Sequence, residues 1–116
     1  MTDIKLLALD LDGTLLNADK KISKRNREAI FAARAKGVKV VLTTGRPLKA
    51  MEYLLDELGT AGLADEYTIT FNGGLVQRNS GQILDKIVFS REDVMRIFRE
   101  TKRLNLPLDA ISDDLV

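Results

Sequence analysis

Two aspartates separated by one residue form the chemically most distinctive part of this sequence, Asp10-Leu11-Asp12-Gly13-Thr14. They follow a mostly apolar stretch, residues 4–9, which we expect to form a short buried strand. Alternate residues of an extended segment point the same way, so both carboxylates should lie on one side of the chain. Because the sequence contains no histidine and no cysteine, this pair is the leading candidate for a nucleophile, an acid–base group or a metal ligand.

Two more polar segments follow predicted strands. Residues 38–43 are almost continuously apolar, which is typical of a strand covered on both faces, and Thr44-Gly45-Arg46-Pro47 comes directly after them. Residues 67–71 alternate in the manner of a third strand and lead into Asn72-Gly73. Helices are predicted over residues 24–36, with Ser23 as the N-cap and Gly37 as the stop, and from Pro47 to Gly59.

The order strand–helix–strand–helix–strand predicts parallel strands joined by right-handed crossovers in an α/β fold. The carboxyl ends of parallel strands share one edge of the sheet, which is where such sheets bind ligands. We therefore expect Asp10, Thr44 and Asn72 to converge at that edge. The convergence follows from topology and needs no comparison with other proteins.

The three segments together resemble the haloacid-dehalogenase (HAD) superfamily of phosphohydrolases. The first segment matches the signature D-x-D-G-T, the second resembles the strand that ends in Thr or Ser, and the Thr-Gly-Arg form is typical of the Cof-type branch, which includes sugar-phosphate phosphatases. The resemblance implies a Rossmannoid, parallel, three-layer core. It also implies a Mg²⁺-dependent hydrolase that acts through an aspartyl-phosphate on a small phosphorylated metabolite, such as a sugar phosphate.

The resemblance assigns roles to single residues. Asp10 is the expected nucleophile, and Asp12 is the expected general acid and then base, a role that needs a pKa above that of Asp10. The Asp10 carboxylate and the Asp12 carbonyl are the expected Mg²⁺ ligands. Thr44 should donate its hydroxyl to a phosphate oxygen, and backbone N–H groups near Leu11 and Gly45 should add donors. Arg46 either approaches the substrate or stabilises its loop, and Asn72 either contacts the substrate or shapes the turn.

The pattern changes after the third predicted strand. Residues 75–78 and 82–89 flank a hairpin turn at Asn79-Ser80-Gly81. A helix capped by Ser90 and Asp93 follows, with an expected inner face of Val94, Ile97, Phe98 and Thr101, then a strand over residues 106–112 and a turn at 113–114. By resemblance, residues 1–82 are the amino-terminal part of the core, which is incomplete here, and residues 83–116 begin an inserted α+β cap domain.

The family's third and fourth signatures, a Lys and a Gly-Asp-x-x-x-Asp segment, are missing from these 116 residues. We expect the chain to be the amino-terminal portion of a longer enzyme and to be inactive alone. Uncovered apolar cap surface would favour self-association of such a chain. A non-catalytic fragment that binds phosphate or metal stays an alternative, as does a receiver-like phosphoacceptor domain, which would carry its Asp after the third strand, where this chain has Asn72.

Net charge and cysteine content bear on the binding partners and the location that we expect for the protein. The net charge is +1, which gives no reason to expect nucleic acid or a membrane, and the absence of cysteine fits a reducing cytoplasm. Between Lys20 and Lys39, however, eight residues are basic and only Glu28 is acidic. A solvated helix face is the ordinary interpretation of such a run, and a positive rim that attracts phosphorylated substrates is the alternative.

Overall fold

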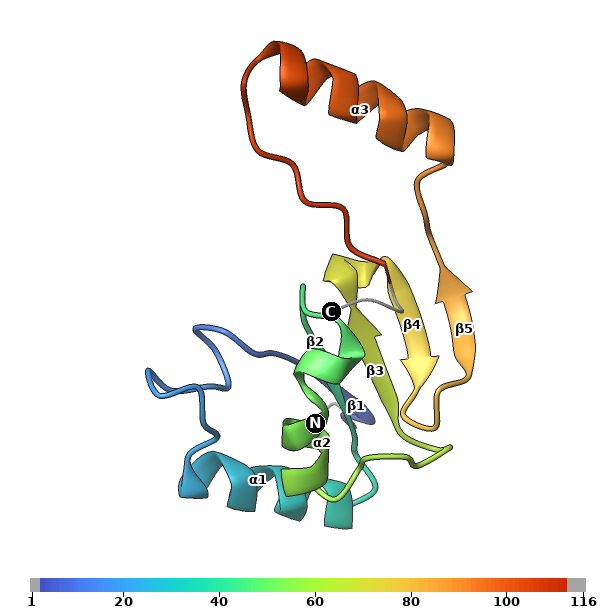
Figure 1. Ribbon diagram of the computed structural model, residues 1–116. Coiled ribbons are helices and arrows are strands. Elements are labelled where there is room, and N and C mark those ends of the chain that lie inside the picture. Colours follow the sequence, from blue (N-terminus) through green and yellow to red (C-terminus); the bar gives the residue numbers. More distant parts are fainter. Residues whose placement is uncertain (1–2, 113–116) are drawn as a thin grey trace. The chain divides into compact units, whose positions relative to one another are not determined.

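The computed structural model describes residues 3–112, which form two compact units that divide between Lys86 and Ile87. The first unit contains a five-stranded sheet in the order β1-β2-β3-β4-β5 (Figure 1). Its strands are β1 (Leu6–Asp10), β2 (Lys39–Thr43), β3 (Tyr67–Thr70), β4 (Leu75–Arg78) and β5 (Ile83–Lys86). The first three strands are parallel, as predicted, and β4 and β5 add an antiparallel hairpin at the other edge.

The hairpin forms where its turn residues predicted it, and it continues the sheet of the first unit. Strand β5 pairs with β4 and lies in the first unit, although we predicted a domain boundary between residues 82 and 83. Where the core ends and a cap begins therefore stays a prediction.

Two helices connect the parallel strands. Helix α1 (Lys24–Ala35) starts at Ser23, whose Oγ accepts a hydrogen bond from the N–H of Asn26 at 3.1 Å, and it ends before Gly37, which has a φ of 83°. After Pro47 the chain forms a short 3₁₀ turn, η1 (Leu48–Ala50), and then α2 (Glu52–Glu57). A second 3₁₀ turn, η2 (Phe71–Gly73), follows β3.

Both helices pack against the same face of the sheet. Ile30 of α1 and Leu54 of α2 join Val40 and Leu42 of β2 in one hydrophobic cluster, together with Leu11. Right-handed crossovers that proceed in one direction along a sheet place successive helices on one face, which explains this arrangement. The described residues thus provide a sheet layer and one helical layer of the predicted three-layer core.

Strand β1 differs from its prediction as a buried strand. Leu6 is 57% exposed and Leu7 is 38% exposed, whereas Val40, Val41 and Leu42 of β2 are buried. The difference arises because β1 is the edge strand of the described sheet and pairs only with β2. Apolar sequence alone cannot distinguish a central strand from an edge strand.

The second unit contains α3 (Arg91–Arg103), whose N-cap Ser90 accepts a hydrogen bond from the N–H of Asp93 as predicted. The expected inner face of this helix is not buried among the described residues, because Ile97 and Phe98 are 39% and 46% exposed. The prediction of a strand over residues 106–112 is wrong: this segment has no regular structure and pairs with none of the described strands. The predicted turn at 113–114 lies outside the described residues. No helix within residues 3–112 is long and apolar enough to span a membrane.

Candidate active site

Strand register brings the three predicted segments to one edge of the sheet. Asp10 lies opposite Thr43, and Thr43 lies opposite Ile69, so the carboxyl ends of β1, β2 and β3 are aligned. The N–H of Thr44 donates to the carbonyl of Ile69 at 2.9 Å, and the N–H of Asn72 donates to the carbonyl of Thr44 at 3.1 Å. The loops that follow β2 and β3 are thereby joined by backbone hydrogen bonds.

The loop that carries the two aspartates is held by its own residues. The hydroxyl of Thr14 donates to Oδ2 of Asp10 at 3.3 Å, and the N–H of Thr14 donates to the carbonyl of Leu11 at 3.2 Å. Gly13 has a φ of 79°, a region that L-residues rarely adopt. The side chain of Leu11 is fully buried in the core, which fixes the loop between the two carboxylates.

Asp12 is held by two cations from different parts of the chain. Arg46 donates from Nε to Oδ2 at 3.0 Å and from NH2 to Oδ1 at 2.6 Å, while Lys20 Nζ lies 2.8 Å from the same Oδ1. The hydrogen bonds from Lys20 and then Arg46 lower the pKa of Asp12 below its usual range. A general acid needs the opposite shift, so Asp12 is held here in its ionised form.

The guanidinium of Arg46 forms a two-pronged pair with Asp12, a contact that the sequence did not predict. Both predicted alternatives for Arg46, contact with the substrate and support of its own loop, stay predictions. Asp12, and then Tyr53 of α2, raise the pKa of Arg46. Such a fork fixes the orientation of a carboxylate as well as its charge.

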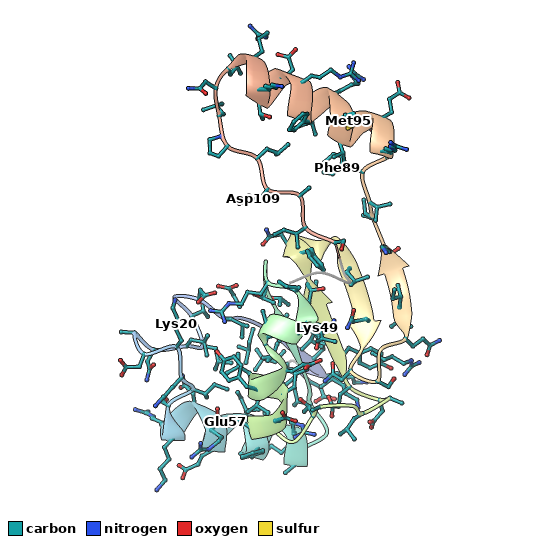
Figure 2. All side chains as sticks on the ribbon, viewed as in Figure 1. Lys20, Lys49, Glu57, Phe89, Met95 and Asp109 are labelled. Atoms are coloured by element: carbon teal, nitrogen blue, oxygen red, sulfur yellow. The ribbon has the colours of Figure 1, made fainter. Side chains whose placement is uncertain are left out.

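Lys20 and Tyr53 are the two site residues that the sequence did not single out. Lys20 lies in the loop between β1 and α1 (Figure 2), and the hydroxyl of Tyr53 donates to its carbonyl at 3.3 Å. The only signal for Lys20 was its place at the start of the basic run, and Tyr53 gave none. Lys20 reaches the site through the folding of a loop and Tyr53 from helix α2, and periodicity predicts neither contact.

Thr44 is arranged to donate a hydrogen bond. Its side chain is buried, and its Oγ1 accepts the N–H of Arg46 at 3.1 Å. That bond uses an acceptor lone pair and leaves the hydroxyl proton available for an external oxygen. The predicted role of Thr44 as a phosphate donor stays a prediction with compatible geometry.

Gly45 and Asn72 are in close contact. A Cβ atom at position 45 would lie 2.9 Å from Oδ1 and 3.1 Å from Nδ2 of Asn72. Asn72 itself has a φ of 54°, so it shapes a left-handed turn, a conformation that Asn tolerates better than most residues. The missing side chain at position 45 is therefore what allows the Asn72 amide to approach the loop after β2.

Three members of the basic run form ion pairs within the fold. Arg27 pairs with Glu57 at 2.7 Å, Arg34 pairs with Glu66 at 3.1 Å, and Lys39 lies 3.5 Å from Asp65. The solvated helix face and the positive rim both stay predictions for the run as a whole. Lys20 is the member of the run that pairs with Asp12 of the site.

The residues present fit a divalent cation only in part. Asp10 supplies a carboxylate whose hydrogen bond to Thr14 is long, and hard oxygens of this kind suit Mg²⁺. Within residues 3–112, no group of three or more Asp, Glu, His or Cys side chains is placed to enclose a metal. The role of Asp10 and Asp12 as Mg²⁺ ligands stays a prediction.

Comparison with known proteins identifies the class. The family model for haloacid dehalogenase-like hydrolases matches residues 7–116, so the chain belongs to this family. Among curated relatives, the Bacillus subtilis protein named "Putative phosphatase YxeH" is 37% identical over 105 residues, covering 90% of this chain and 38% of that protein. The B. subtilis 5-amino-6-(5-phospho-D-ribitylamino)uracil phosphatase YcsE is 35% identical over 96 residues, covering 83% of this chain and 37% of that protein.

Solved structures agree on the fold. A haloacid dehalogenase-like hydrolase from Bacteroides thetaiotaomicron superposes with a TM-score of 0.75 and 32% identity, covering 89% of this chain and 39% of the other. The predicted fold class, a HAD-like α/β core in incomplete form, is confirmed. The chain spans less than half the length of the relatives it matches.

Proposed function

We propose that the protein carrying this chain is a phosphomonoester hydrolase in which Asp10 attacks phosphorus and Asp12 acts first as the general acid and then as the general base. The observation that carries the proposal is that the end of β1, with its Asp10 and Asp12 motif, and the Thr44 loop after β2 lie at the same edge of the sheet. The family and the phosphatase names of the relatives supply the reaction class. A small phosphorylated metabolite is the proposed substrate, and the cytoplasm is the proposed location.

The chemistry assigns one task to each group. Oxygen of the Asp10 carboxylate forms a bond to phosphorus as the bond to the leaving oxygen breaks, which splits a slow hydrolysis into two displacements. The Thr44 hydroxyl donates to a phosphoryl oxygen, where fixed donors stabilise developing charge. Asp12 protonates the leaving oxygen and later takes a proton from the attacking water. When bound by Asp10 and the Asp12 carbonyl, Mg²⁺ would neutralise phosphoryl charge.

An Asp10→Asn substitution tests the nucleophile. An amide is a poor nucleophile and a poor metal ligand, so turnover of an aryl phosphate by the full-length variant should vanish. Asp12→Asn should be severely impaired yet still able to accumulate phosphoenzyme, because it keeps the nucleophile. Steady-state rates and phosphoenzyme trapping measure both effects.

Asp19→Asn is the matched control. Asp19 lies in the loop between β1 and α1, and its carboxylate makes no contact with the site among the described residues. It should behave as the unmodified protein. Turnover at an unchanged rate by Asp10→Asn would overturn the proposed function.

A further inference from the structure

The Asp12 carboxylate has little room left for a substrate. Oδ1 accepts from Lys20 and from Arg46, and Oδ2 accepts from Arg46. A carboxylate offers about four acceptor positions, two on each oxygen, so Oδ1 is fully used and Oδ2 keeps one. An acid–base group must direct one oxygen at the leaving group of the substrate. Oδ1 can take that role only if one of its two contacts leaves when a substrate arrives.

The two cations are held very differently. Arg46 makes two hydrogen bonds to Asp12, its side chain is 26% exposed, and its own N–H is tied to Thr44. Lys20 makes one side-chain contact and its side chain is 61% exposed. A single ammonium on a flexible stem exchanges partners more readily than a two-pronged guanidinium. Lys20 is thus the contact that can leave.

The loop is built to present Lys20 at the site. The backbone of Lys20 has a φ of 59°, which is uncommon for a residue other than glycine. Asn17 holds this conformation: its Oδ1 accepts the N–H groups of Asp19 and Lys21, both at 3.0 Å. Its carbonyl also accepts the N–H of Lys20, and Tyr53 donates to the carbonyl of Lys20. A fixed loop with a mobile ammonium at its tip is suited to transfer that ammonium between two anions.

We propose that Lys20 is a positioning residue that pairs with Asp12 in the free site and moves to the phosphate of the incoming substrate, leaving Arg46 to hold Asp12. This inference rests on the proposed function, because it takes the phosphomonoester as the ligand. The exchange breaks one ion pair and forms another, with no covalent bond made and no proton transferred. It frees one acceptor position on Oδ1 of Asp12 for the leaving group, while Arg46 keeps the other.

The energetic order of the two pairs supports the transfer. The pair between Lys20 and Asp12 is exposed to water, and exposed pairs contribute little to stability. A phosphate monoester carries more charge than a carboxylate and offers more oxygens, so its hydrogen bond to an ammonium is the stronger one. The net gain should appear in binding of the substrate, because Lys20 holds phosphate before the reaction begins.

The test compares three variants of the full-length protein. Lys20→Asn removes the ammonium, and Asn tolerates the left-handed backbone, so the loop is kept. Lys20→Arg keeps a cation. Lys21→Asn removes the neighbouring lysine, whose side chain makes no contact with the site among the described residues. Turnover of an aryl phosphate gives kcat and KM, and calorimetry with inorganic phosphate gives a binding constant that needs no turnover.

We expect Lys20→Asn to raise KM and the dissociation constant of inorganic phosphate about tenfold, which corresponds to about 1.4 kcal/mol. Its kcat should change less than about threefold, because Arg46 still orients Asp12. Lys20→Arg should restore most of the binding, and Lys21→Asn should match the unmodified protein.

Two results would overturn the inference. Unchanged KM and unchanged phosphate binding in Lys20→Asn would mean that Lys20 never reaches the phosphate. A fall in kcat with unchanged KM would mean that Lys20 acts on Asp12 throughout the reaction. Both results leave the proposed function intact if Asp10→Asn is inactive, whereas an active Asp10→Asn would refute the proposed function whatever Lys20 does.

Discussion

Replacing Gly45 by alanine should disturb the site although the φ of this residue does not require glycine. The φ of Gly45 lies outside the left-handed region, so alanine meets no backbone strain. The obstacle is the Asn72 amide, whose Oδ1 would lie 2.9 Å from the new Cβ. Either Asn72 rotates away or the loop after β2 shifts, and both movements displace neighbours of the Thr44 hydroxyl.

The cost follows from two opposing effects. Inserting a methyl group into a filled space costs about 1–3 kcal/mol, and the value should be low in this range because the obstacle is the end of a side chain. Alanine recovers about 0.4–1 kcal/mol by restricting the unfolded chain. We expect a net loss of about 0.5 kcal/mol in the free energy of unfolding, the difference between these two effects. Activity should fall further, since misplacement of a catalytic group by about 1 Å can cost about 10²-fold in rate.

A double-mutant cycle separates this contact from other effects. Asn72→Gly removes the obstacle and retains a residue suited to a φ of 54°. Urea unfolding and aryl phosphate turnover are measured for the full-length protein, both single variants and the double variant. We expect Gly45→Ala to be harmless to stability when Asn72→Gly is present. Additive losses from the two substitutions would refute the steric argument.

Two further predictions concern charge and the open sheet edge. Arg46→Met should raise the pKa of Asp12 toward its usual range, and carboxyl-carbon NMR can measure this shift. Because the folded-state pKa of Asp12 is lowered, its ionised form stabilises the fold above the unfolded-state pKa, and this contribution is lost as the pH falls through the folded-state pKa. The variant should lose the contribution at a higher pH than the unmodified protein on acidification. An unchanged Asp12 titration would contradict the assignment of the pair. Residues 1–116 alone should turn over aryl phosphates at least about 10⁴-fold more slowly than the full-length protein. They should also self-associate through the exposed edge strand β1, which light scattering would show. Leu6→Lys should reduce this association. Full activity of a monomeric 1–116 chain would contradict both statements.

Local sequence signals predicted most of the elements near the site. Ser23 and Gly37 bracket α1 because a hydroxyl acceptor and a left-handed residue are needed at the two helix ends. The alternation of strands and helices predicted the common edge for Asp10 and Thr44, because topology and handedness leave one arrangement. The helix ends needed only neighbours in sequence, and the common edge needed only the order of the elements and the handedness of their connections.

The wrong predictions concern segments whose burial or strand pairing depends on residues that are distant in the sequence. Leu6 and Leu7 are apolar as in a buried strand, but burial depends on what lies beside β1, and only β2 does among the described residues. Residues 106–112 have a suitable composition for a strand but pair with none of the described strands. Thr68 and Thr70 are the fully buried members of β3, and the Thr68 hydroxyl donates to Oδ1 of Asn79 in the hairpin turn, a partner 11 positions away.

The aspartate motif located the candidate site, but it did not predict that Asp12 pairs with Arg46. The two residues are 34 positions apart, and Lys20 reaches the same carboxylate from a loop with no periodic pattern. Family resemblance assigns Asp12 to proton transfer, while the contacts in the free site lower its pKa and keep it ionised. A carboxylate that must later donate a proton needs fewer cations around it than Asp12 has here. Departure of Lys20 removes one of the two cations and leaves the orienting fork of Arg46, so a single movement would serve both phosphate binding and the release of Asp12.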